Sequence, residues 1–158
     1  MQIIQFHIIT LISLVYSQNH LVRVPYIVQL LDDKQIFCAG SLLNPTHVIS
    51  AAQCFVDRDL KKDKFTVAAG VNIRDEANSF QKALKVVVPR RYRRRSRNKD
   101  VAIIILASAL QGMILKHIPL CDESSNDRDQ LQISGWGLNE KTQNGYRLSS
   151  VFANILSR

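Results

Sequence analysis

The chain has 158 residues, which is enough for one ordinary domain, and its 46% hydrophobic and 22% charged content is a normal globular balance. There are 21 Lys and Arg residues against 13 Asp and Glu residues, a formal net charge of +8. This excess favours anionic partners, namely sulfated glycans, acidic proteins or membrane surfaces. No internal repeat, phosphate-binding loop or metal-ligand cluster occurs, and His7, His20, His47 and His117 are scattered. We therefore expect neither a cofactor nor a metal.

The first residues, Met1 to Ser17, have the pattern of a secretory signal. Residues 8–15 form a short apolar core, and a cut after Ser17 fits the residues that precede it. The alternatives are a buried strand or a short membrane anchor, although the run is too short to span a bilayer comfortably. No later segment could span a membrane. We expect an extracellular protein, and nucleic acid is not an expected partner of a secreted chain.

The segments that follow alternate between apolar runs and turn residues, which is typical of strands. Asp32-Asp33-Lys34 is expected to be a turn, and Asn44-Pro45 to join the strands of a hairpin. Residues 57–64 and 72–78 are expected to be polar loops. The expected strands are 24–30, 35–43, 47–50, 65–70, 80–88, 101–106, 131–137 and 148–156. In the fifth of these, the inward position falls on either Ala83 or Leu84.

Residues 90–99 contain seven cationic side chains in ten positions. One interpretation is a solvated loop whose charges repel one another. The other is an anion-binding patch, because arginine forks match the geometry of sulfate and carboxylate groups. The candidate anion-binding residues are Arg90, Arg91, Arg93, Arg94, Arg95 and Arg97.

Three motifs, in order along the chain, resemble those of trypsin-like serine peptidases, the chymotrypsin or peptidase S1 family. Ala51-Ala52-Gln53-Cys54 resembles the family's Ala-Ala-His-Cys, Asp100-Val101-Ala102 its catalytic-aspartate motif, and Ser134-Gly135-Trp136-Gly137 the strand that opens its second barrel. The resemblance covers nearly all of the chain after the expected signal. It implies an all-β fold with a complete first antiparallel barrel, and a second barrel represented only by its opening hairpin.

The resemblance also assigns individual residues. It implies a disulfide between Cys38 and Cys54, and it places Asp100 at the aspartate of the catalytic triad and Gln53 at the histidine. Cys121 then has no obvious mate, and both pairing between two chains and a buried reduced thiol remain open. The implied domains are a signal at 1–17, the first barrel with its linker at 18–120, and the start of the second barrel at 121–158.

Gln53 argues against proteolysis, because the triad needs an imidazole that accepts and returns a proton near neutral pH. A glutamine amide does not titrate there. The chain also shows no Ile-Val-Gly-Gly activation start, for which Arg23-Val24 is the nearest imitation, and no Gly-Asp-Ser-Gly-Gly nucleophile segment. We therefore expect a pseudo-protease that acts by binding, as a decoy, as a cofactor of an active protease or as an anion-dependent adhesion module. The alternative is a fragment or degenerate copy of a trypsin-like endopeptidase, from an incomplete gene record.

Overall fold

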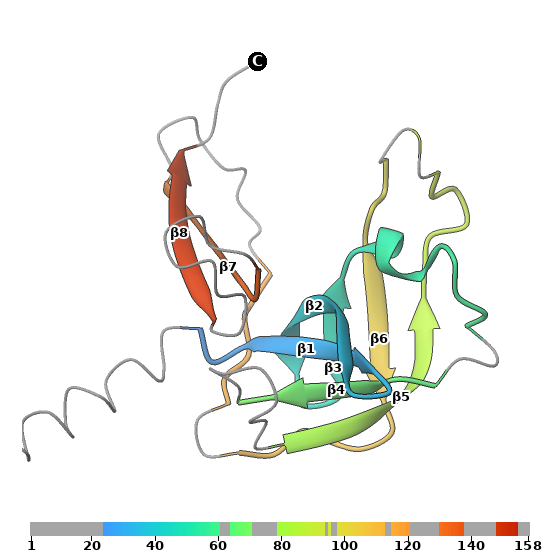
Figure 1. Ribbon diagram of the computed structural model, residues 1–158, viewed down its shortest axis with the longest axis horizontal. Coiled ribbons are helices and arrows are strands. Elements are labelled where there is room, and N and C mark those ends of the chain that lie inside the picture. The colour runs from blue at the N-terminus through green and yellow to red at the C-terminus, as the bar shows by residue number, and fades with distance from the viewer. Residues whose placement is uncertain are drawn as a thin grey trace, which may run out of the picture.

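The structure, a computed structural model, describes residues 24–60, 64–70, 79–93, 95, 98–112, 115–120, 130–137 and 148–154. Six strands of the described chain form a closed antiparallel barrel with the order β1-β2-β3-β6-β5-β4, and two more form a separate hairpin (Figure 1). The strands are β1 Ile27–Asp32, β2 Gln35–Asn44, β3 His47–Ser50, β4 Thr66–Ala69, β5 Ser79–Val87, β6 Ala102–Leu106, β7 Gln130–Gly135 and β8 Ser149–Asn154. The predicted fold class is confirmed.

The barrel core follows from the alternation of side chains along each strand. In β6, Ala102, Ile104 and Leu106 are buried while the residues between them are partly exposed, as the period of two in a strand requires. The buried cluster takes members from five of the barrel strands and from the segments beside them: Val28, Leu30, Leu42, Val48, Phe55, Phe65, Val67, Ala69, Ala102, Ile104, Leu106 and Leu110. The sixth strand, β5, contributes partly buried Ala83 and Val86.

The structure decides between the two alternatives for β5. Ala83 packs against the core, while Leu84 is 71% exposed. The pairing of β5 with β6 shifts register between Ala83 and Lys85, so simple alternation could not fix the inward position from sequence. The first strand also differs slightly from expectation, because β1 begins at Ile27 and the Ile27 N–H donates to the Val24 carbonyl in a preceding turn.

Residues 107–120, expected to be a linker, contain no strand in their described part and lie along the barrel. Their backbone N–H groups donate to carbonyls of the barrel or the segments beside it: Ala107 to Lys82, Leu110 to Pro45, Lys116 to Pro25, and Ile118 to Leu42. The linker is therefore hydrogen-bonded to β2, to β5 and to the turns beside β1 and β3.

The hairpin of β7 and β8 stands to one side of the barrel (Figure 1). Its directly paired residues Ile133 and Val151 share one face, with Leu131 two positions along. These side chains are 58%, 57% and 46% exposed, so the hairpin carries an apolar face that the described residues leave open to solvent.

Candidate functional site

The candidate site is built around the 3-10 turn η1 (Ala52–Phe55), which directly follows β3. Ala52 and Phe55 are buried and hold the turn against the barrel, whereas Gln53 between them is exposed. The Phe55 ring packs near those of Phe37 and Phe65, with centroid distances of 6.1 and 5.6 Å. The Gln53 side chain therefore lies at the surface, on a turn whose buried residues Ala52 and Phe55 pack against the barrel core.

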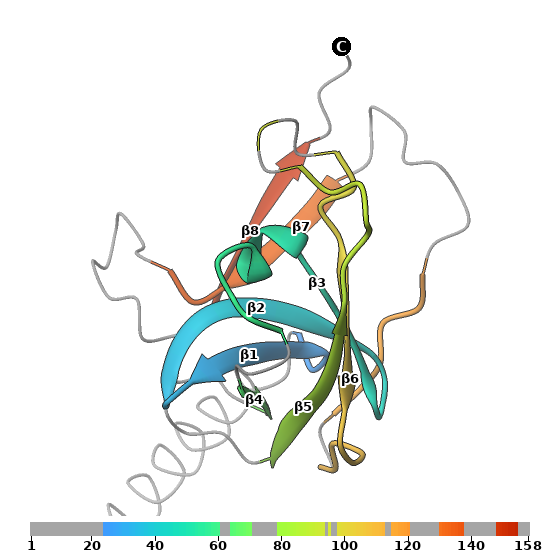
Figure 2. The same cartoon turned by 90° about the vertical axis from the view of Figure 1, so that its right-hand side faces the viewer.

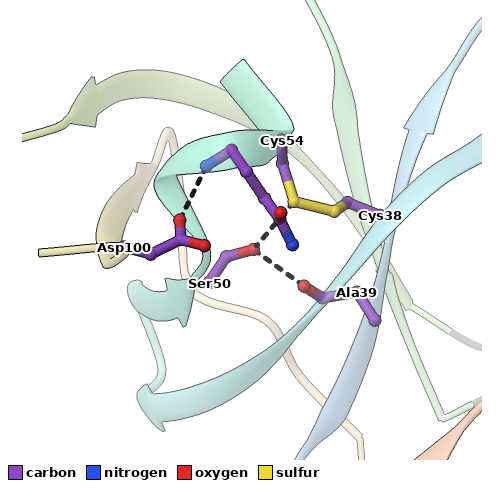
Figure 3. The surroundings of a disulfide bond; sticks show 6 residues. Cys38, Ala39, Ser50, Cys54 and Asp100 are labelled. Atoms are coloured by element: carbon purple, nitrogen blue, oxygen red, sulfur yellow. Dashed lines mark hydrogen bonds between the residues drawn. A yellow bond between two sulfur atoms is a disulfide. The ribbon is translucent and has the colours of Figure 1, made fainter. Parts of the chain in front are cut away.

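Asp100 lies at the open start of this turn. The residue before the turn, Ala51, has no side chain that could accept a hydrogen bond from the first N–H groups of η1. Asp100 supplies that acceptor from 47 positions along the chain, because its Oδ1 receives the Gln53 backbone N–H at 2.8 Å (Figure 3). The observed bond is thus to the main chain of Gln53 and not to its side chain.

Disruption of this contact has a measurable consequence. An Asp100→Ala variant should lose about 1 kcal/mol of unfolding free energy, the usual cost of removing a capping side chain. Hydrogen exchange at the Gln53 amide should accelerate about fivefold or more for the same reason. An Asp100→Asn variant keeps an oxygen at this position and is the matched control, expected to retain most of the protection. Equal exchange rates in the wild type and the alanine variant would contradict this role of Asp100.

The predicted disulfide is confirmed. Cys38 in β2 is bonded to Cys54 in η1, with a Cα–Cα distance of 6.2 Å that is normal for such a bridge. The Ser50 hydroxyl donates to the Ala39 carbonyl at 2.8 Å, just beyond the last paired residues of β2 and β3 (Figure 3). The bridge and this hydroxyl together tie the η1 turn to β2. No role was predicted for Ser50, although it directly precedes the Ala51-Ala52-Gln53-Cys54 motif.

His47 lies at the opposite end of β3 from η1. It pairs with Ile105, whereas Ser50 at the near end pairs with Ala102, a separation of three residues or about 10 Å along the strand. Its Nδ1 is 3.0 Å from both the Asn44 side-chain oxygen and the Thr46 hydroxyl. We infer that His47 belongs to the β2–β3 turn and does not stand in for an imidazole at the Gln53 position.

The arginine-rich segment connects β5 to β6 and projects from the end of the barrel where η1 lies (Figures 1 and 2). Its described part includes four of the predicted anion-binding residues, namely Arg90, Arg91, Arg93 and Arg95, all exposed. Arg94 and Arg97 lie outside the described residues, as does Cys121. The described residues of this loop line a surface pocket.

The described ranges, 24–60, 64–70, 79–93, 95, 98–112, 115–120, 130–137 and 148–154, also bear on metal binding and membrane insertion. Those ranges hold no group of three or more His, Cys, Asp or Glu side chains positioned for a metal ion. They also contain no apolar helix of the length needed to cross a membrane.

A closed six-stranded antiparallel barrel, a disulfide-flanked turn after its third strand and an aspartate just before its last strand define one barrel of a trypsin-like peptidase fold. The chain belongs to the trypsin family, whose model matches residues 15–158.

Relatives agree with this assignment. The chain is 30% identical over 141 residues to serine protease 1 of Rattus norvegicus, covering 85% of this chain and 54% of that protein. Trypsin II-P29 of Gallus gallus is 30% identical over 142 residues, with the same two shares. Seminase of Drosophila melanogaster is 24% identical over 120 residues, covering 76% of this chain and 43% of that protein. The chain thus spans about half the length of the curated relatives it matches.

Proposed function

We propose that this chain is a secreted homologue of trypsin-like serine proteases that does not catalyse proteolysis and acts by binding another molecule. The observation that carries the proposal is Gln53. It directly precedes Cys54 of the disulfide, and its main chain is bonded to Asp100. In the resembling motif this position is the histidine that moves the proton.

The chemistry of the glutamine side chain supports loss of activity. The amide can donate and accept hydrogen bonds, but it cannot take a proton from a hydroxyl nucleophile and return it to a leaving amine. In a related triad enzyme, removal of the histidine alone lowers turnover by about a million-fold. The hydrogen bond from the Gln53 N–H gives Asp100 a structural role that does not require an imidazole.

Catalysis can be tested directly on protein purified from its natural source. We expect no cleavage of a mixed peptide library above background and no labelling by a serine-directed fluorophosphonate, because general-base catalysis is lost. Active trypsin, assayed in parallel at equal concentration, is the positive control. Labelling together with cleavage, both abolished by a serine protease inhibitor, would refute the proposal.

Secretion and domain arrangement form part of the same proposal. The apolar core of residues 8–15 and the Cys38–Cys54 bridge both favour an extracellular protein. We assign residues 1–17 to a signal, 18–120 to the first barrel with its linker, and 121–158 to the opening of a second barrel. An active protease or another protein is the partner that this class of homologue would engage, and Cys121 is available in the sequence for a bond between chains.

The second candidate is a fragment or degenerate copy of a trypsin-like serine-type endopeptidase. It is favoured by the relatives named serine protease 1 and trypsin II-P29, because the match covers only 54% of each of them. The intact mass of the natural protein separates the two candidates. A mass near that of residues 18–158 favours the first, and a mass near that of the relatives favours the second.

A further inference from the structure

The loop between β5 and β6 encloses a pocket of about 580 Å³, lined by Arg90, Arg91, Tyr92, Arg93, Asn98 and Lys99. The pairing of the two strands ends at Val87 and Ile103, so the chain separates into two arms beyond that point. One arm carries residues 90–93 and the other residues 98–99, and the pocket lies between them. Its size is within the usual range of small-ligand sites.

Local hydrogen bonds fix the backbone of both arms. On the first arm, the Tyr92 N–H donates to the Pro89 carbonyl at 3.0 Å. On the second, the Val101 N–H donates to the Lys99 carbonyl at 2.8 Å, and Lys99 adopts a left-handed φ of 61°. The pocket is therefore bounded by two tight turns, each next to a strand of the closed barrel. This arrangement argues against the simpler interpretation of the segment as a loop that only repels itself.

The charge in the pocket is concentrated and of one sign. Arg90, Arg91, Arg93 and Lys99 are all exposed, and the described lining contains no carboxylate. Among described residues, no ion pair involves Arg90, Arg91 or Lys99, and the ion pair seen elsewhere joins Arg58 to Asp32. Arg90, Arg91 and Lys99, held close together without an ion-pair partner among the described residues, favour an anionic ligand, because the ligand relieves their mutual repulsion.

We propose that this pocket binds a sulfated glycan chain. Guanidinium forks donate two parallel hydrogen bonds to a sulfate group, and cations on both arms suit a ligand with several anionic groups along its length. Tyr92 is half-buried and gives the pocket an apolar wall, and the Asn98 amide adds a neutral donor and acceptor. A linear sulfated sugar combines these features, since it carries repeated anions, hydroxyl groups and apolar ring faces.

The inference rests on the proposed binding function and gives that function a ligand and a location. Lys99, which lines the pocket, directly precedes Asp100, whose carboxylate accepts a hydrogen bond from the Gln53 N–H. The β5–β6 connection and the η1 turn lie at the same end of the barrel (Figures 1 and 2). The two proposals are still separable by experiment. If the protein neither cleaves peptides nor binds glycan, only the glycan inference is refuted. If it cleaves peptides, the proposed non-catalytic function is refuted, whatever the glycan result.

The experiment measures binding of a size-defined heparin octasaccharide to the full chain at 0.15 M NaCl. The pocket variant is Arg90→Ala/Arg91→Ala/Lys99→Ala. The matched control, Lys64→Ala/Lys82→Ala/Lys116→Ala, removes the same charge from exposed positions outside the pocket. We expect the pocket variant to bind about tenfold or more weakly, and the control less than about threefold. The salt dependence of binding should also fall in the pocket variant only.

A second variant guards against misfolding of the first. Arg90→Lys/Arg91→Lys keeps both charges but loses the forked geometry, and it should weaken binding about threefold through the lost bidentate bonds. Polyglutamate of equal charge should bind at least about tenfold more weakly than the octasaccharide, because it lacks sulfate and sugar groups. The proposal is overturned if the wild type binds no octasaccharide, if both alanine variants weaken binding equally, if the lysine variant binds like the wild type, or if polyglutamate binds as tightly.

Discussion

Removal of the Cys38–Cys54 bridge should lower the free energy of unfolding by about 3 kcal/mol, which is the chain-entropy expectation for a closed loop of this length. The bridge spans 16 positions and encloses the β2–β3 hairpin together with the start of η1. Both sulfur-bearing side chains also pack against the core cluster, so a Cys38→Ala/Cys54→Ala variant loses contacts as well as the cross-link.

Chemical denaturation of the double variant and the wild type measures this effect. Reduction of the wild type should reproduce most of the loss, while the same reductant should leave the double variant unchanged, which controls for other actions of the reagent. The η1 turn should respond first, because the bridge and the Ser50 hydroxyl tie it to β2. A loss below about 1 kcal/mol would mean that packing alone holds the turn, contrary to the usual range for native bridges in small domains.

A Gly40→Ala variant should lose about 1–3 kcal/mol, the usual cost of overpacking a well-filled interior. A Cβ atom at this position of β2 would stand 2.6 Å from Val48 Cγ1 and 2.8 Å from the Ile49 carbonyl oxygen. The second of these atoms belongs to the backbone of β3, so it cannot move aside without disturbing the pairing of the two strands. Gly40 is required here for close approach.

Gly135→Ala provides the matched control. This glycine ends β7, and a Cβ atom there would meet nothing within 4 Å. The substitution should be neutral or stabilise by about 0.5 kcal/mol, because alanine restricts the unfolded chain. Thermal unfolding of the two variants side by side tests the difference. Equal transition temperatures would show that β3 can yield to a methyl group at Gly40.

Much of the barrel could be predicted from sequence, because its strands carry apolar runs bounded by turn residues. The hairpin around Asn44-Pro45, the turn at Asp33-Lys34 and the strand after Asp100 all appear in the structure within a residue or two of the expected bounds. Alternation failed where the ladder is irregular. In β5, the register shift near Ala83 turns Leu84 outward, and Phe80 in the same strand is 52% exposed although it fitted the apolar pattern.

Other features depend on contacts between segments that are distant along the chain, and the local sequence does not predict them. Residues 57–64 were expected to be a polar loop, yet Arg58 stacks 3.7 Å from the Phe37 ring centroid and forms a 2.8 Å ion pair with Asp32. Gln29 is another case, because it is 1% exposed although glutamine is usually at the surface. Neither the contacts of Arg58 nor the burial of Gln29 can be predicted from the identity of the residue alone.

The candidate site was predictable in its membership but not in its contacts. The motifs placed Gln53, Asp100 and the cysteine pair together through their resemblance to a known family. The motifs do not specify that the backbone N–H of Gln53 is the group that donates to the Asp100 carboxylate. Because Ala51 has no side chain that could accept a hydrogen bond, the Gln53 N–H of η1 donates to Asp100 instead.

The path of residues 107–118 bears on how this molecule should be divided for expression. A fragment cut after β6 would retain every barrel strand, but it would expose the carbonyl groups of Lys82, Pro45, Pro25 and Leu42 that this segment now covers. The smallest sensible recombinant unit therefore runs past Ile118, because the Ile118 N–H donates the last of these four hydrogen bonds.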